Sequence, residues 1–196
     1  RMRYGSGKVA LTPVFSPRDW LPDPSLWDLD RLVAMIEGAR ERVRVQLLSY
    51  QATHHGGEYW PHLENALRAA AARGVEVELL LSHWETRASR IAGLKSLQCL
   101  PHVTVKILTV PEWSGGFIPY ARVIHAKYMV VDGRQGWLGT SNWQGDYFFS
   151  SRNAGIVFDG EGLAHALDDF FERGWDYETS VVVDPGRDYP EPRRGE

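Results

Sequence analysis

A histidine and a lysine separated by one residue form the pair of side chains most capable of catalysis in this sequence. They lie in the stretch VIHAKYMVVDGRQGWLGTSNW, residues 123–143. His125 can attack phosphorus or move a proton near neutral pH, and Lys127 offers a positive charge to a phosphate oxygen. In a strand both side chains point to one face. A predicted hairpin brings further donors back toward Lys127, namely those of Thr140, Ser141 and Asn142. The pattern indicates a phosphate site.

A sheet with helices is expected to position this pair. Apolar and β-branched stretches predict strands at 9–15, 43–50, 75–81, 103–110, 122–131, 136–139 and 154–158. Apolar residues at helical spacing predict helices at 29–36, 63–70, 86–98 and 163–171. Asp28 is expected to cap the first helix, and Asp132-Gly133 to form a hairpin turn. The alternation of strands and helices predicts an α/β fold, one three-layer domain with a mixed sheet flanked by helices.

The chain length of 196 residues suits one domain, since domains average roughly 150 residues. We expect a lead-in over residues 1–12, one domain over 13–183 and a flexible tail over 184–196. Hydrophobic residues make up 43% and charged residues 24% of the chain, which is typical of a globular protein. The composition therefore excludes a disordered or collagen-like chain.

Charge and cysteine content exclude several other classes. The net charge of −3 argues against a protein that binds nucleic acid or an anionic membrane over a whole face. Cys99 is the only cysteine, which excludes an internal disulfide and a zinc site with several thiolates. No apolar run reaches the length of about 18 residues that suggests a membrane span, and residues 1–8 lack the apolar core of a signal peptide. We expect a soluble chain and leave its compartment open.

The spacing around His125 carries a family resemblance. The pattern His125-x-Lys127-x-x-x-x-Asp132, followed by Gly139-Thr140-x-Asn142, resembles the HKD signature of the phospholipase D superfamily. The stretches IPYARVIHAKYMVVD and GTSNWQGDYF look most like the C-terminal half of lysosomal 5′-exonucleases and poxvirus envelope phospholipases. Further similar segments are SPRDW, the strand end at Tyr50, Tyr59-Trp60-Pro61, RGVEVELLLSHW and Gly174-Trp175-Asp176. The resemblance spans roughly residues 12–183.

The resemblance implies a fold, an activity and a set of site residues. Members of this family cleave phosphodiesters through a covalent phosphohistidine, without a metal or another cofactor. The implied catalytic residues are His125, Lys127, Asp132 and Asn142. Asp132 is expected to position its strand rather than to touch substrate. The expected substrate-binding residues are Thr140, Ser141 and Trp143.

A single motif is half of what this mechanism requires. One histidine cannot attack phosphorus and also protonate the leaving oxygen on its opposite side, and no other histidine has a lysine two residues later. The second motif comes either from a second copy of the chain or from a missing N-terminal half. The likeness to C-terminal halves favours the missing half, and it favours general acid/base over nucleophile for His125. The family often has a glutamate that orients this histidine, where Asn153 stands here, and Asp146 is a substitute.

Other candidate residues carry weaker signals. His54 and His55 follow a strand end, where they could line the rim of the site, bind a metal or lie in a solvated loop. Tyr120 is a further rim candidate. The aromatic residues near the motif could stack bases, hold acyl chains or simply pack: Trp113, Phe117, Tyr120, Trp143, Tyr147 and Phe148.

Two functions from different classes remain after this reading. The first is a metal-independent hydrolase that cleaves or transfers a phosphodiester, either of a phospholipid, as in lipid degradation, or of single-stranded nucleic acid, as a nuclease. The second is a non-catalytic half that binds phosphate or lipid and needs or has lost its partner motif. The branch resemblance favours nucleic acid, while the net charge of −3 argues mildly against it.

Overall fold

A computed structural model gives the structure of residues 2–4, 7–54 and 57–195. The strands are β1 (Met2–Tyr4), β2 (Gly7–Ser16), β3 (Arg42–Leu47), β4 (Glu76–Ser82), β5 (Val103–Leu108), β6 (Tyr128–Val131), β7 (Gln135–Gly139), β8 (Asn153–Asp159) and β9 (Ser180–Val182). The α-helices are α1 (Asp28–Gly38), α2 (His62–Ala72), α3 (Ala88–Gln98), α4 (Gly145–Phe149) and α5 (Glu161–Trp175). Short 3₁₀ turns are η1 (Arg18–Trp20), η2 (Pro24–Leu26) and η3 (His83–Thr86).

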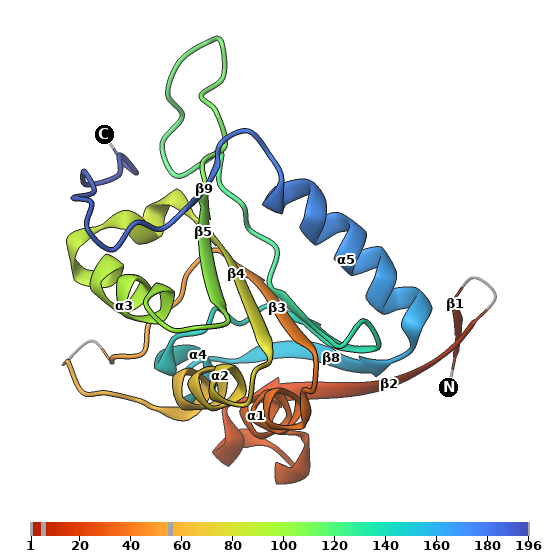
Figure 1. Cartoon of the computed structure of the whole chain (residues 1–196). Helices are drawn as coiled ribbons and strands as arrows, with labels where there is room; N and C mark the ends of the chain where they lie inside the picture. The colour runs from red at the N-terminus through yellow and green to blue at the C-terminus, as the bar shows by residue number, and fades with distance from the viewer. Residues whose placement is uncertain (1, 5–6, 55–56, 196) are drawn as a thin grey trace.

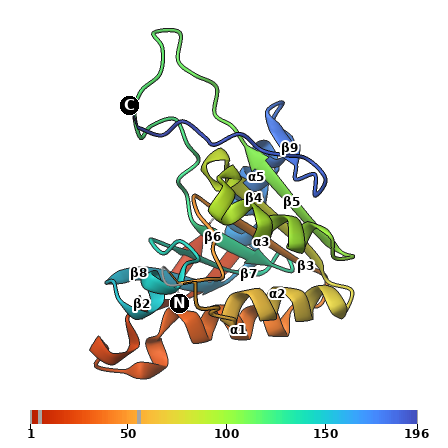
Figure 2. The same ribbon diagram turned by 90° about the vertical axis from the view of Figure 1, so that its left-hand side faces the viewer.

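The described strands form one mixed sheet in the order β1-β2-β8-β7-β6-β3-β4-β5-β9. Strands β3, β4 and β5 are parallel, and the other neighbouring pairs run antiparallel. Helices α1, α2 and α3 cover one face and α5 covers the other (Figures 1 and 2). The expected three-layer α/β domain with a mixed sheet is therefore confirmed.

The core lies on both faces of the sheet because the central strands alternate buried side chains. On β6, Met129 and Val131 pack with α1 and α2, whereas Tyr128 and Val130 pack toward α5. Strand β3 is almost wholly buried, as expected for a strand covered by helices on both faces. This two-sided burial makes the middle of the sheet a rigid platform.

One edge of this platform collects the strand ends that matter for function. The carboxyl ends of β3, β4 and β5 lie there, together with the start of β6, the end of β7 and the start of β8. Loops at the carboxyl ends of parallel strands are the usual position of sites in α/β folds. The predicted His-Lys pair lies at this edge.

The hairpin between β6 and β7 follows its sequence signal. Asp132 and Gly133 both have positive φ, 51° and 62°, and the Arg134 N–H donates to the Val131 carbonyl across the turn. Such a turn matches the twist of the flanking strands and favours Asp-Gly. The hairpin prediction is confirmed.

Three expectations about element ends need correction. The strand predicted over 122–131 begins only at Tyr128, since Tyr120 and Arg122 have positive φ and break the extended path. Asp28 does not cap α1 from outside, because it is the first helical residue and Trp27 holds the cap position. The strand predicted over 43–50 ends at Leu47.

The two ends of the chain contact the rest of the fold, one through the sheet and the other through the loop between β5 and β6. Strand β2 pairs with β8 from Ala10 to Ser16, so it crosses the expected boundary between lead-in and domain. In the tail, the Arg194 carbonyl accepts from the Tyr120 N–H, and Arg193 stacks on Phe117 at 3.8 Å. No helix within the described residues has the length and apolar character needed to cross a membrane.

Candidate active site

His125 and Lys127 meet at the functional edge of the sheet, just before β6. The Lys127 Nζ lies 3.2 Å from both ring nitrogens of His125 and donates to the His125 carbonyl at 2.7 Å. Lys127 is buried, whereas His125 is exposed. The Gly139 N–H donates to the Lys127 carbonyl, which ties this segment to the end of β7. The sequence-based pairing of these two side chains is confirmed, although neither residue is inside the strand.

The electrostatics of the pair favour an uncharged imidazole in the free site. Desolvation, and then the positive charge of Lys127, lower the pKa of His125. Burial also lowers the pKa of Lys127. A neutral imidazole can act as a nucleophile or a base, and a phosphate anion placed beside Lys127 would offset the ammonium charge.

Asn142 lies at the same edge and is largely committed to the scaffold. Its Oδ1 accepts from the Ser49 N–H at 3.1 Å, and its Nδ2 donates to the Tyr147 hydroxyl at 3.1 Å. Gln46 at the end of β3 pairs with Tyr128 at the start of β6, so the residues that follow β3 lie beside those that precede β6. Asn142 is bonded to Ser49, which follows β3, and it therefore lies close to the His-Lys segment. An amide nitrogen carries two N–H groups, and Tyr147 takes one of them.

Ser141 and Trp143 are buried, and their expected role in binding substrate stays a prediction. Ser141 is 1% exposed and donates from Oγ to Asp28 Oδ2 at 3.2 Å. Trp143 is fully buried, and its N–H and carbonyl bond to the backbone of Ser49 and Gln51. Through these contacts Ser141 and Trp143 hold the loop to the core.

Thr140 is exposed at the end of β7, and its role as a substrate-binding residue stays a prediction. Its hydroxyl donates to the Asn153 Oδ1 at 3.0 Å, and Asn153 in turn donates to the Tyr147 carbonyl. Asn153, which stands where relatives often have a glutamate, is thus occupied in joining β7 to β8. Asp146 Oδ1 lies 3.9 Å from His54 Nδ1.

Asp132 lies at the far end of β6 and has a structural task. Its carboxylate accepts three backbone N–H groups, those of Arg40, Glu41 and Arg42. At about 3.3 Å per residue, the span from His125 to Asp132 is roughly 20 Å. Asp132 therefore lies far from a substrate at His125, in agreement with the positioning role implied by the resemblance.

The rim candidates have different surroundings. His54 packs against α4, with its ring 6.1 Å from that of Phe149. Tyr120 is 73% exposed and meets Trp84 edge to face. His55 lies outside the described residues. Among the residues that the structure describes, no group of three or more His, Cys, Asp or Glu side chains is placed to hold a metal ion.

Two residues at the site were missed by sequence reasoning. Asp28 is 1% exposed, and burial raises its pKa to about 7 against the hydrogen bond from Ser141. An aspartate at a helix start is normally a cap, so nothing in the sequence marked it. His83 follows β4 at the functional edge, where burial lowers its pKa. Its position directly after a strand end was a usable signal.

Comparison with known proteins decides the family. The family described as "Cardiolipin synthase, PLD-like domain" matches residues 32–175, which is most of the chain and includes both residues of the His-Lys pair. The chain belongs to the phospholipase D superfamily.

Curated relatives of this phospholipase D chain have two kinds of name. "5'-3' exonuclease PLD4" of Mus musculus is 36% identical over 86% of the chain and 37% of its own length. "Probable phospholipase D F09G2.8" of Caenorhabditis elegans is 34% identical over 84% of the chain and 33% of its own length. The chain thus spans about a third of the length of these relatives.

Solved structures agree on the phospholipase D fold. Nuc from Salmonella typhimurium, titled a phospholipase D family member, superposes with a TM-score of 0.68 at 16% identity, covering 89% of this chain and 98% of its own. NucT from Helicobacter pylori gives a TM-score of 0.69 at 20% identity, covering 89% and 99%. At these identities the likeness shows a shared fold.

Proposed function

We propose that this chain supplies one half of a metal-independent phosphodiesterase site that works through a phosphohistidine. The observation that carries the proposal is the exposed His125 ring with the Lys127 ammonium 3.2 Å from its nitrogens. This pair offers a phosphodiester both a reactive imidazole and a positive charge at one place. Membership of the phospholipase D superfamily and the names of its relatives support the reaction class.

The reaction needs a second histidine on the opposite side of phosphorus. One imidazole nitrogen forms a bond to phosphorus while the bond to the leaving oxygen breaks, and that oxygen takes a proton from the other histidine. Water or an alcohol, deprotonated by the same second histidine, then attacks phosphorus and breaks the P–N bond. His125 is one of the two groups, and its partner comes from a second copy or a missing N-terminal half.

Single-stranded nucleic acid is the substrate that we favour, because curated relatives include proteins named 5'-3' exonucleases. A phospholipid is the alternative, supported by relatives named phospholipase D. A non-catalytic half that binds phosphate remains the competing function class, supported by the small share of its relatives that the chain spans.

The test compares wild type with His125→Ala in an assembly that holds both halves. We expect hydrolysis of a single-stranded oligonucleotide to fall at least 1000-fold in the variant, as roughly expected when a group that acts on the reacting atoms is removed. Phosphoamino acid analysis of a reaction quenched with base then shows which half carries phosphohistidine, because the P–N bond is stable in base and is hydrolysed in acid. Undiminished hydrolysis by His125→Ala would refute the catalytic role, and hydrolysis abolished by a chelator would refute metal independence.

A further inference from the structure

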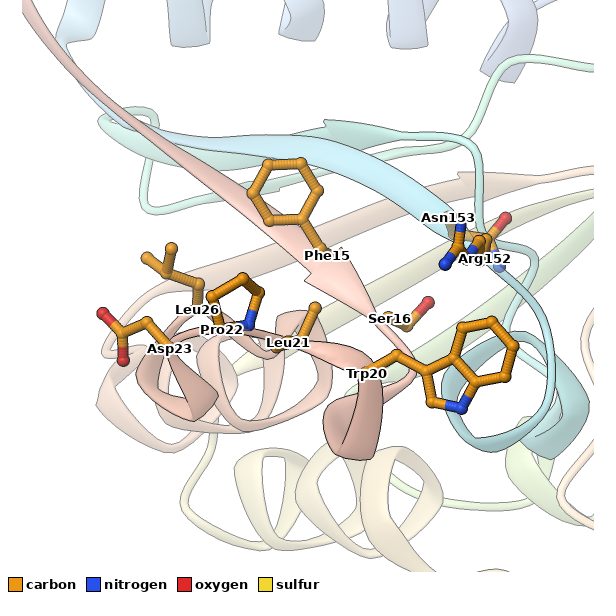
Figure 3. A pocket seen from close by; sticks show the side chains of 9 residues that line it. All are labelled: Phe15, Ser16, Trp20, Leu21, Pro22, Asp23, Leu26, Arg152 and Asn153. Carbon is orange, nitrogen blue, oxygen red and sulfur yellow. The ribbon is translucent and has the colours of Figure 1, made fainter.

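A second hollow lies next to the His-Lys edge, at the end of β2 (Figure 3). It has a volume of about 420 Å³ and is walled by β2, the turns η1 and η2, and the start of β8. Its lining is mostly apolar, with two charged residues, Arg152 and Asp23. Figure 3 shows Trp20 and Arg152 at one end of the hollow and Asp23 at the other.

The guanidinium of Arg152 lies over one face of the Trp20 ring in this hollow, which leaves the other face of the indole for a ligand. The Arg152 guanidinium carbon lies 4.7 Å from the centre of the Trp20 ring. Trp20 is still 65% exposed, which is unusual for the largest apolar side chain. Exposed indole and guanidinium planes are the surfaces on which proteins stack unpaired bases.

One hydrogen bond links the lining of the hollow to the end of β7. Asn153 lines the hollow and accepts a hydrogen bond from Thr140, at the end of β7. Strand β8 is two positions from β6 in the sheet, a distance of roughly 10 Å at about 4.8 Å per strand. A group in this hollow is therefore a neighbour of the phosphodiester at His125 rather than the reacting group.

The charges of the hollow distinguish a base from an acyl chain. The pKa of Asp23 is lowered first by a hydrogen bond from the Ser25 side chain and then by the one from the Ser25 N–H, so the carboxylate stays ionised. An acyl chain would desolvate that carboxylate and the Arg152 guanidinium without giving either a partner. A base with an amino group donates to Asp23, and its phosphate pairs with Arg152.

We propose that this hollow is a subsite for the nucleotide adjacent to the scissile phosphodiester of a single-stranded nucleic acid. The base stacks on Trp20, Asp23 accepts from its exocyclic amino group, and Arg152 binds the neighbouring phosphate. The subsite rests on the proposed function for its place in the reaction, but it is tested by binding rather than by turnover.

The experiment measures the affinity of the full chain for labelled oligonucleotides of about six nucleotides, a usual site size, by fluorescence anisotropy. Trp20→Ala is expected to weaken binding of oligo-dC by roughly 5- to 100-fold, the usual loss for one stacked base. Tyr177→Ala, which removes an exposed aromatic residue after α5, is the matched control and should bind as wild type. Arg152→Lys keeps the charge but loses the plane, so its binding should fall less than that of Trp20→Ala.

Asp23→Asn tests the base contact separately. Wild type should prefer oligo-dC, whose base carries an amino group, over oligo-dT. The asparagine oxygen can keep the Ser25 N–H bond while its amide N–H₂ faces the base, so the preference should shift toward oligo-dT. An unchanged preference would overturn the role of Asp23.

Other outcomes would overturn the subsite itself. These are wild-type binding by Trp20→Ala, an equal loss in Tyr177→Ala, or no oligonucleotide binding by the wild-type chain. Displacement of the oligonucleotide by micelles of a short-chain phosphatidylcholine, if lost in Trp20→Ala, would assign the hollow to an acyl chain. If binding is unaffected but hydrolysis still depends on His125, the subsite fails and the proposed function stands.

Discussion

At the scale of single residues, the site pairs an exposed imidazole with a buried ammonium. Desolvation and the neighbouring charge both lower the pKa of His125, so the free site holds a neutral ring beside Lys127. A neutral ring can attack phosphorus or take a proton. To act as a general acid, His125 must gain a proton after the negative charge of the substrate arrives.

Two substitutions of Asn142 separate its role in holding the fold together from its role in binding a phosphodiester. Asn142→Leu should lower the free energy of unfolding by about 1–3 kcal/mol, because the Ser49 N–H loses its buried acceptor. Asn142→Asp keeps that acceptor, so it should fold better than Asn142→Leu but bind a phosphodiester less well than wild type because of charge repulsion. Denaturant unfolding and phosphodiester binding measure the two effects.

Tyr147→Phe is the control and should leave phosphodiester binding unchanged. Equal binding by Asn142→Asp and wild type would argue against a role of Asn142 in binding substrate.

Asp28 predicts an unusual dependence of stability on pH. Its pKa is raised to about 7 by burial, so between about pH 4 and pH 7 the folded chain keeps a proton that the unfolded chain has lost. This group therefore makes the protein less stable as the pH rises through that window. Asp28→Asn, which stays neutral, should gain about 2–4 kcal/mol relative to wild type between pH 4 and pH 7, as measured by urea unfolding.

The comparison with Asp28→Asn is needed because other carboxyl groups make the protein more stable, not less, as the pH rises. Hydrogen bonding from Arg134 lowers the pKa of Asp159, so that carboxylate stabilises the fold above its unfolded pKa and loses this effect as the pH falls. The difference between wild type and Asp28→Asn removes such shared contributions. Parallel pH profiles for the two proteins would show that Asp28 is not buried as a protonated acid.

At the scale of elements, the β6–β7 hairpin is anchored to the α1–β3 connection by one carboxylate. Asp132→Ala leaves three backbone N–H groups without their acceptor and puts alanine at positive φ. We expect a loss of about 2–4 kcal/mol in the free energy of unfolding. Substrate affinity of the folded protein should stay within a few-fold of wild type.

A matched variant separates charge from conformation at this turn. Asp132→Asn keeps an acceptor and tolerates positive φ, so its stability should lie between those of wild type and Asp132→Ala. Thermal unfolding combined with phosphodiester binding makes the comparison. Full stability with lost binding in Asp132→Ala would contradict the anchoring role.

The element pattern was predictable from sequence where local signals agreed with the tertiary structure. Strand β3 and helix α5 have strong apolar patterns, and Asp132-Gly133 favours one turn type, so the sequence predicts each of them, although β3 ends three residues earlier than expected. The start of β6 was placed six residues early. Residues 122–127 are rich in strand formers, but the positive φ of Arg122 and the end of partner strand β3 at Leu47 stop the pairing.

Of the candidate site, only the His-Lys pair could be predicted from the sequence. His125 and Lys127 are close in sequence, and their spacing alone brought them together correctly. The burial of Ser141 and Trp143 depends on segment 49–51 pairing with 143, and no local pattern encodes that pairing. The contact of Asp28 with Ser141 joins residues far apart in the chain, which is why sequence reasoning took Asp28 for a cap.

At the scale of the whole molecule, the proposed function assigns one half of an active site to this domain. Turnover should therefore depend on a second His-Lys pair. If two copies supply it, activity should rise with the square of chain concentration below the dimer dissociation constant, and sedimentation velocity at assay concentration should show the dimer. Multiple turnover by a chain that sediments as a monomer would contradict the half-site account.

The most direct test of the central claim, that His125 and Lys127 together hold a phosphodiester, is the pKa of His125 measured by NMR with and without dimethyl phosphate. We expect the ligand to raise this pKa, because its negative charge offsets the positive charge of Lys127. In Lys127→Gln the pKa of the free protein should already be higher than in wild type, and the ligand should bind more weakly. His102 serves as the internal control, because it pairs with Glu76 at the opposite edge of the sheet from His125. An identical His125 titration with and without saturating dimethyl phosphate would contradict the account.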